Sequence, residues 1–498
     1  MMIYIPAGYV STIGDPNVDW NFRTQPDSST HDRVYPWPRG KVLGGTSSIN
    51  GLVYMRGQPQ DYDGWRQLGC DGWAWDDVLP YFRRSESNER GADEWHGGDG
   101  PMRVTDNRER TAVANAVIEA CVQAGLPPRD DLNGPAMEGA SWCQQTSSHG
   151  RRCSSATAFL HPALRRPNLK VLTDAVVTKV VIEDKRAVGV TYIRKGIVHG
   201  IRARREVILS GGTVNSPQLL ELSGLGAASR LQRQGIDVVA DLPGVGENLQ
   251  DHFVTLMAYR VQPHVRTANE LSRGWRFGRE LVRYAVQRRG LLTYGAGAVG
   301  IFCRSRPDAA TPDIQYHVFG ASFDTSPSTK PHRLRRKLER EPGITFASCV
   351  ARPESRGSIH IVSADPLMPP AIVTNYLSAR ADQDIAVKAL RWVRTIASQP
   401  ALASYIVRET RPGPSLEADR DLLDYARTSG NPGYHPVGTC RMGRDEKAVV
   451  DPQLRVRGVA ALRVVDASIM PRIISGNTNA PAIMIAEKAA DLVLGQRR

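Results

Sequence analysis

The stretch "GKVLGGTSSINGLVY", residues 40–54, is the most informative short segment of this sequence. It places glycines and small polar residues in front of an apolar run. Such a composition is typical of a loop that holds a phosphate or a cofactor, because glycine lets the backbone approach a ligand closely. The question is therefore which ligand the loop serves.

The size and composition of the chain indicate a multidomain globular protein. Its 498 residues exceed one hydrophobic core and predict two or three domains. The 64 Lys and Arg outnumber the 51 Asp and Glu, and part of the excess clusters in residues 260–290 and 330–341. We interpret these runs as solvated surface, with a peripheral membrane contact as the alternative. Nothing in the sequence resembles a nucleic-acid-binding module.

The cysteine pattern and the apolar runs bear on the cellular compartment. Seven scattered cysteines without a C-x-x-C pair predict neither a disulfide framework nor a metal site, and they favour a reducing compartment. No apolar run has the roughly 18 residues that a membrane span needs, and the first 20 residues lack the pattern of a signal peptide. We expect a cytoplasmic protein.

Hydrophobic periodicity predicts a layered α/β chain. Helices are expected after Asp76 and Asp77 and over 109–125 and 381–398. A β-hairpin is expected over 169–184 and 187–196. The apolar run at residues 206–212 predicts a strand that leads into a helix at 216–224. The composition after residue 253 indicates basic helix and then loops, followed by a β-rich block at 344–366 and a strand, loop and helix over 462–495.

One literal dinucleotide-binding motif, "GAGAVG" at Gly295–Gly300, lies in the wrong context. The motif normally joins a strand to a helix. Here a basic helical run precedes it and a short strand-like run follows. We therefore interpret it as an ordinary loop.

Five ordered segments resemble the glucose-methanol-choline (GMC) oxidoreductases, flavoenzymes that oxidise alcohols. The first two extend the opening loop as "GKVLGGTSSINGLVYMRGQPQDYDGW" and add "GGTVNSPQLLELSGLG" (211–226). The other three are "LPGVGENLQDH" (242–252), "NPGYHPVGTCRMG" (431–443) and "VVDASIMPRIISGNTNAPAIMIAEKAADL" (464–492).

The resemblance implies a fold and a domain division. It implies an FAD-binding Rossmann-like domain from residues 1–58, 151–252 and 450–498, and an α+β substrate-binding domain with an antiparallel sheet from 59–150 and 253–449. Family members begin with a βαβ unit that carries G-x-G-x-x-G. This chain opens on "IYIPAGY", which resembles the segment after that unit, so we expect the FAD-binding domain to be incomplete.

The resemblance also implies the catalytic pair. Oxidising an alcohol requires a base for the hydroxyl proton, and histidine is the side chain suited to that role near neutral pH. The family's catalytic histidine corresponds to His435, between Tyr434 and Pro436. Its partner corresponds to Asn477, with Asn479 as the competing position. An asparagine can donate a hydrogen bond to the substrate oxygen without taking the proton.

The cofactor implied by the resemblance is FAD, bound without a covalent bond, because the position of the family's flavin-linked histidine is Ile49 here. Val177 is expected to meet the adenine through its backbone, and Asp466 and Ala467 the ribityl-diphosphate. The residues expected to line the flavin and pyrophosphate are Leu43, Gly44, Gly45, Thr46, Asn50, Gly51, Leu52 and Val53.

Three functions remain open at this stage. The first is FAD-dependent oxidation of a primary alcohol to an aldehyde, with either a quinone or oxygen as the electron acceptor. The second is a non-catalytic remnant of the fold that cannot hold FAD. The third is a lyase on the same scaffold, because some family members cleave cyanohydrins.

Overall fold

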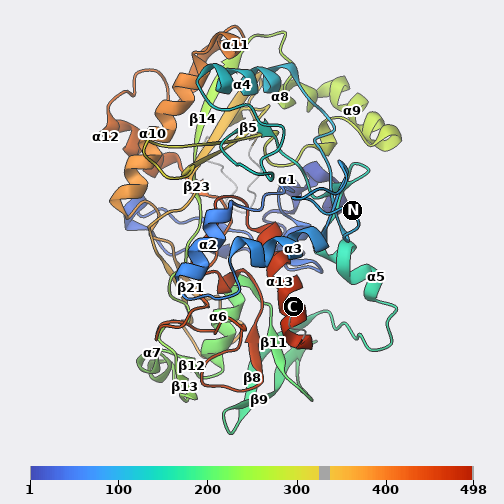
Figure 1. Cartoon of the computed structure of the whole chain (residues 1–498), viewed down its shortest axis with the longest axis vertical. Helices are drawn as coiled ribbons and strands as arrows, with labels where there is room; N and C mark the ends of the chain where they lie inside the picture. The colour runs from blue at the N-terminus through green and yellow to red at the C-terminus, as the bar shows by residue number, and fades with distance from the viewer. Residues whose placement is uncertain (1, 325–336, 496–498) are drawn as a thin grey trace.

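The computed structural model describes residues 2–324 and 337–495 (Figure 1). Residues 330–336 of the second basic run lie outside the described residues. No helix within the described ranges is both long and apolar enough to cross a membrane.

The upper half of Figure 1 is built on a seven-stranded antiparallel sheet. Five of its strands follow the order β14-β19-β16-β15-β5, β22 flanks β14 on the other side, and β23 pairs with the start of β14. The strand bounds are β5 Gly139–Trp142, β14 Phe253–Val261, β15 Val299–Cys303, β16 Ile314–Phe319, β19 Gly343–Val350, β22 Ile406–Arg411 and β23 Asn431–Pro432.

Side chains of this sheet alternate between a helix-covered face and a cavity, as the period of two in a strand requires. Met257, Tyr316 and Phe346 belong to a core cluster with Val117 of α4 and Leu390 of α10. The intervening side chains line a cavity on the opposite face. They are Val254 and Leu256 of β14, His317 and Phe319 of β16, and Ala347 and Cys349 of β19. The helices that cover the first face are α4 Ala112–Gln123, α10 Arg380–Ala397, α11 Pro400–Ala403 and α12 Asp419–Ser429.

The lower half contains smaller sheets and several helices (Figure 1). A three-stranded antiparallel sheet has the order β10-β9-β8, and β11 pairs in parallel with β24. Helix α13 follows β24 and packs on α3, where Arg84 binds Asp491. The bounds are α3 Trp75–Ser85, β8 Ala175–Glu183, β9 Arg186–Arg194, β10 Ile197–Arg202, β11 Val207–Leu209, α6 Gly212–Leu222, β24 Leu462–Val464 and α13 Asn479–Leu494.

The remaining helices and strands are the following. The helices are α1 Tyr9–Thr12, α2 Pro59–Gln67, α5 His161–Ala163, α7 Ala228–Arg233, α8 Ala268–Leu271 and α9 Gly274–Gln287. The strands are β1 Phe22–Arg23, β2 Pro36–Trp37, β3 Glu86–Asn88, β4 Met102–Val104, β6 Ser147–Ser148, β7 Arg151–Arg152, β12 Leu225–Gly226, β13 Ala240–Asp241, β17 Phe323–Asp324, β18 Lys337–Leu338, β20 Ser358–His360 and β21 Ala371–Val373.

The predicted elements agree with the structure except after residue 252. The helices expected near 76, over 109–125 and over 381–398 are α3, α4 and α10, and the expected hairpin is β8–β9. The prediction of helix and loops after 253 missed two central strands of the sheet, β14 and β16. The β14 sequence "FVTLMAYRV" is almost continuously apolar because both faces are buried, so it shows no alternating pattern. The domain division stays a prediction.

Candidate active site

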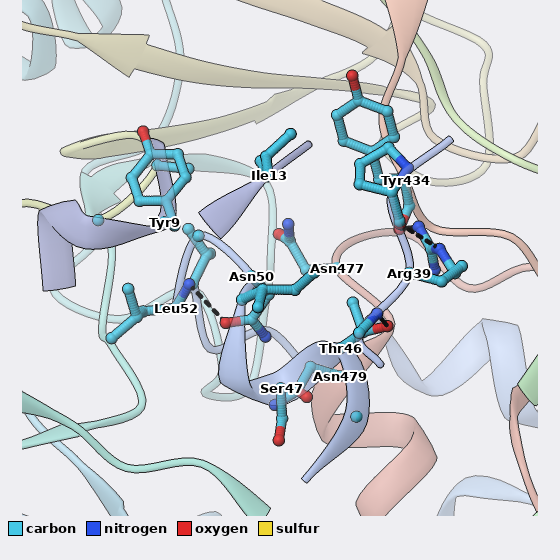
Figure 2. Close-up of a pocket in the computed structure, with 18 of the residues that line it drawn as sticks. Tyr9, Ile13, Arg39, Thr46, Ser47, Asn50, Leu52, Tyr434, Asn477 and Asn479 are labelled. Atoms are coloured by element: carbon cyan, nitrogen blue, oxygen red, sulfur yellow. Dashed lines mark hydrogen bonds between the residues drawn. The ribbon is translucent and has the colours of Figure 1, made fainter. Parts of the chain in front are cut away.

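A cavity of ≈ 3790 Å³ separates the two halves, and every candidate site residue lines it (Figure 2). Pockets for a single drug-sized ligand measure about 300–1,000 Å³. This cavity therefore has room for an extended cofactor together with a substrate. The candidate residues in its wall are Leu43, Gly44, Gly45, Thr46, Asn50, Gly51, Leu52, Val53, Val177, His435, Asp466, Ala467, Asn477 and Asn479.

The glycine loop forms one wall by virtue of its backbone geometry. Gly44 and Gly45 both have positive φ, +86° and +53°, which side chains other than glycine rarely adopt. A Cβ on Gly44 would come within 2.6 Å of the Ser48 hydroxyl, whereas a Cβ on Gly45 would project into open space. The bare main chain of the loop therefore faces the cavity, and Figure 2 shows Thr46, Ser47 and Asn50 on this wall.

Arg152 supports the glycine loop through hydrogen bonds, and the sequence did not predict these contacts. Its guanidinium donates to the Asn50 carbonyl (2.7 Å), the Asn50 side-chain oxygen (2.6 Å) and the Ser47 carbonyl (3.1 Å). Burial lowers the pKa of Arg152 to about 9. The Asn50 side-chain oxygen also accepts from the Leu52 amide (Figure 2). These bonds fix the orientation of the loop before any ligand binds.

Asp466 joins two elements at the opposite wall. Its carboxylate accepts from the Gly212 amide (2.9 Å) and the Ser216 hydroxyl (2.6 Å) of α6, and from the Ser468 amide (2.8 Å) after β24. The structure thus gives Asp466 a positioning role in the cavity wall. Asn479 begins α13, and Pro481 lies in the first turn of that helix, where its missing N–H costs no hydrogen bond.

His435 and Asn477 meet at the cavity, although 42 positions separate them in the sequence. Asn477 Nδ2 lies 2.9 Å from His435 Nε2. The Gln315 side chain donates to Asn477 Oδ1 at 3.3 Å, so the amide nitrogen of Asn477 points to the histidine. An asparagine nitrogen only donates. His435 Nε2 therefore carries a lone pair, which is the form that a general base needs.

A second histidine, His252, fixes the tautomer of His435 from the other side. His252 Nε2 lies 2.8 Å from the Ala351 carbonyl, which can only accept, so this nitrogen carries the proton. His252 Nδ1 is then an acceptor, and His435 Nδ1, 3.0 Å away, donates to it. The carbonyl of Ala351 thereby determines, through His252, that the proton of neutral His435 is on Nδ1 and the lone pair is on Nε2.

Burial keeps His435 neutral. Burial, with smaller contributions from His252, His317 and Arg39, lowers the pKa of His435 well below its usual value. Burial also lowers the pKa of His252 and of His317 to about 4. Burial raises the pKa of Asp251 to about 6, against the opposing effects of the Tyr376 hydroxyl and Arg39. At neutral pH the three imidazoles are uncharged.

The loop that carries His435 is held by main-chain bonds on both sides. The His435 amide donates to Asp251 (2.6 Å), and the Gly433 amide donates to the His252 carbonyl (2.6 Å). Arg39 donates to the Tyr434 carbonyl, as Figure 2 shows. The "QDH" end of the segment 242–252 thus supports the loop that carries His435. This segment is the signal that could have identified Asp251 and His252.

The literal glycine motif at Gly295–Gly300 leads into strand β15 and not into a helix, as its context predicts. Its Ala296 amide donates to the Gly51 carbonyl, and a Cβ on Gly51 would collide with the Ala296 side chain. The segment therefore closes the cavity against the opening loop. His317, which also lines the cavity, has no hydrogen-bond partner for either ring nitrogen among the described residues.

Comparisons with known proteins identify the family. Two models of the GMC oxidoreductases match residues 2–254 and 353–486. The chain is 41% identical to an alcohol dehydrogenase [acceptor] of Pseudomonas putida, covering 99% of this chain and 88% of that protein. It is also 41% identical to the mitochondrial choline dehydrogenase of Mus musculus, covering 99% and 82%.

Solved structures agree with this fold. The pyridoxine 4-oxidase from Mesorbium loti superposes with a TM-score of 0.88 at 29% identity, covering 100% of this chain and 92% of that one. A formate oxidase of Aspergillus oryzae has the same fold, with a TM-score of 0.90 at 24% identity over 100% of this chain and 91% of that one. The chain therefore belongs to the GMC oxidoreductase family and is an FAD-dependent oxidoreductase of the alcohol and choline dehydrogenase type.

Proposed function

We propose that the chain oxidises a primary alcohol to an aldehyde and that His435 takes the hydroxyl proton. The observation that carries this proposal is the pair of contacts on His435, because Ala351 and His252 on one side and Asn477 on the other leave Nε2 as the acceptor. Asn477 also has an amide that can donate to the substrate oxygen, which holds the hydroxyl beside the base. The Nε2 lone pair accepts from Asn477 in the free site, so the substrate hydroxyl takes the place of that amide when it donates to His435.

The residues that line the cavity fit the flavin and diphosphate parts of a non-covalently bound FAD. The main chain of Gly44 and Gly45 faces the cavity without side chains, and the cavity extends past Ala467 to Val177. Ile49 is buried and offers no nucleophile for a covalent bond to the flavin. When bound, FAD supplies the hydride acceptor that no side chain provides. We expect residues 43–46 and 50–53, together with Asp466 and Asn479, to contact it.

We further propose that the substrate is uncharged. The cavity wall carries more arginine and lysine than acidic residues. Glu109 is paired with Arg283 (3.0 Å), Glu339 is paired with Arg260 (3.4 Å), and buried Glu280 accepts from the Leu291 amide. A cationic alcohol such as choline would thus meet a wall with more positive than negative side chains. The sheet wall near His435 is apolar apart from His317, which favours an apolar chain on the alcohol.

We propose that the protein works in a reducing compartment. All seven cysteines are buried as free thiols. Burial raises the pKa of the Cys349 thiol, which lines the cavity, to about 12, so it stays protonated and unreactive.

Turnover with an artificial electron acceptor tests the function. Purified protein supplied with FAD is assayed against a series of primary alkanols, benzyl alcohol and choline. We expect aldehyde formation from the neutral alcohols and a lower kcat/KM for choline. Activity with choline alone would refute the uncharged substrate and leave alcohol oxidation intact. No aldehyde from any alcohol, with FAD bound, would refute the oxidation itself.

A further inference from the structure

Helix α9, Gly274–Gln287, is attached to the protein through its polar side. Glu280 and Tyr284 are its buried residues. The Glu280 carboxylate accepts from the Leu291 amide (2.9 Å), and the Tyr284 hydroxyl donates to the Gly150 carbonyl (3.1 Å). The helix lies at the outer edge of the upper half, at the right of Figure 1.

The apolar side of α9 faces outward. Trp275, Val282 and Val286 are 72%, 64% and 76% exposed. Their spacing of seven and four positions places them on one stripe of the helix. A surface helix normally turns its apolar stripe to the core and its polar residues to water. The arrangement in α9 is the reverse, which marks the stripe as a contact surface.

Positive charge surrounds this stripe. Residues 262–290 contain seven arginines and two glutamates. One glutamate, Glu280, is buried and lies 3.7 Å from Arg279, and the other, Glu270, pairs with Arg276 at 3.0 Å, so the remaining arginines outnumber the acidic groups. Two guanidinium groups flank the exposed tryptophan, with Arg276 at 6.0 Å and Arg279 at 5.5 Å from the Trp275 ring. The surface therefore combines apolar side chains with an excess of cations.

We propose that α9 docks the protein on an anionic lipid surface. A helix with a tryptophan-containing apolar stripe and flanking arginines matches both parts of such a surface, the acyl region and the negative headgroups. A second copy of this chain fits less well, because a symmetric contact would bring the two arginine clusters together.

Docking through α9 brings the edge of the cavity to the lipid. Phe277, Arg279 and Arg283 of the same helix line the cavity, whereas Trp275, Val282 and Val286 do not. An apolar alcohol or a lipid-soluble electron acceptor would then reach the cavity directly from the bilayer. Vesicle binding needs no turnover, so it is measured independently of the proposed oxidation.

Flotation with vesicles tests the proposal. The full-length protein is mixed with vesicles of phosphatidylcholine alone or with phosphatidylglycerol, at low and high salt. We expect flotation with the anionic vesicles and loss of it at high salt. The variant Trp275→Ser/Val286→Ser should no longer float. For the variant Arg276→Gln/Arg289→Gln, the partition coefficient onto anionic vesicles should fall about 25-fold. Each arginine removed near an anionic surface is expected to lower it about fivefold.

A matched control removes apolar side chains that are equally exposed elsewhere. Ile197→Ser/Val198→Ser on β10, where these residues are 62% and 66% exposed, should float like the parent. Thermal unfolding verifies that each variant is folded. The proposal is wrong if the parent does not bind anionic vesicles or if the α9 variants bind as well as the parent. It is also wrong if size-exclusion chromatography with light scattering shows a dimer that the α9 variants convert to monomer.

Discussion

Replacing His252 by leucine tests how the active site holds its base. Leucine fills a similar volume, but it cannot accept a hydrogen bond. His252 is fully buried, and its Nδ1 is the acceptor for His435 Nδ1 at 3.0 Å. Without that acceptor, His435 either keeps an unsatisfied buried N–H or moves its proton to Nε2. In the second case Nε2 can no longer accept the proton of the alcohol.

The magnitude follows from the hydrogen bond that is lost. An unsatisfied buried donor costs about 1–3 kcal/mol. If the competent tautomer is disfavoured by this amount, kcat/KM falls about 5- to 150-fold, because about 1.4 kcal/mol is a factor of ten. His252→Asn is the matched control. Its side-chain oxygen takes the approximate place of Nδ1, so it keeps an acceptor for His435 although it loses the bond to Ala351.

The assay is the pH dependence of kcat/KM for a primary alcohol, with FAD content and thermal unfolding measured on the same samples. We expect His252→Leu to lose activity across the whole pH range and His252→Asn to recover most of it. Equal losses in the two variants would assign His252 a packing role and refute the tautomer argument, as would a leucine variant with full activity.

Three further predictions concern the same site. In the parent, kcat/KM should stay constant from high to neutral pH and fall only below about pH 6.5. The reason is that burial lowers the pKa of His435, and protonation of His435 removes the base. A fall that begins above pH 7 would contradict this. Asn477→Asp should move that fall to higher pH, since a carboxylate 2.9 Å from Nε2 favours the imidazolium, whereas Asn477→Ala, the uncharged control, should not. Acid precipitation should release all flavin into the supernatant, because Ile49 cannot form a covalent bond to it, and flavin that remains with the pellet would refute non-covalent binding.

The sequence identified candidate residues that meet in one cavity, but it missed part of the sheet that supports them. The five segments that resemble the family contain 13 of the candidate residues, and the structure brings these together in one cavity with Val177. The strand, loop and helix expected over 462–495 are also present as β24, the loop with Asn477 and α13, since periodicity and glycine are local signals. Such signals depend on a few neighbouring residues, so they can be interpreted without the tertiary structure.

The features that were missed depend on distant parts of the chain. Strand β14 is apolar on both faces, so its sequence does not distinguish it from a buried helix. The role of His252 depends on the Ala351 carbonyl, 99 positions later in the chain. Arg152 supports Asn50 across 102 positions. No spacing in the sequence could have revealed these contacts.

The most direct test of the central claim is to add a primary alcohol anaerobically to the FAD-loaded protein and to His435→Gln with the same FAD content. The parent should lose its visible flavin absorption within the mixing time or at a measurable rate. The variant should do so about 10²- to 10⁴-fold more slowly, which is the usual contribution of a general base. An unchanged spectrum in the parent with every alcohol, or equal rates in parent and variant, would contradict the account.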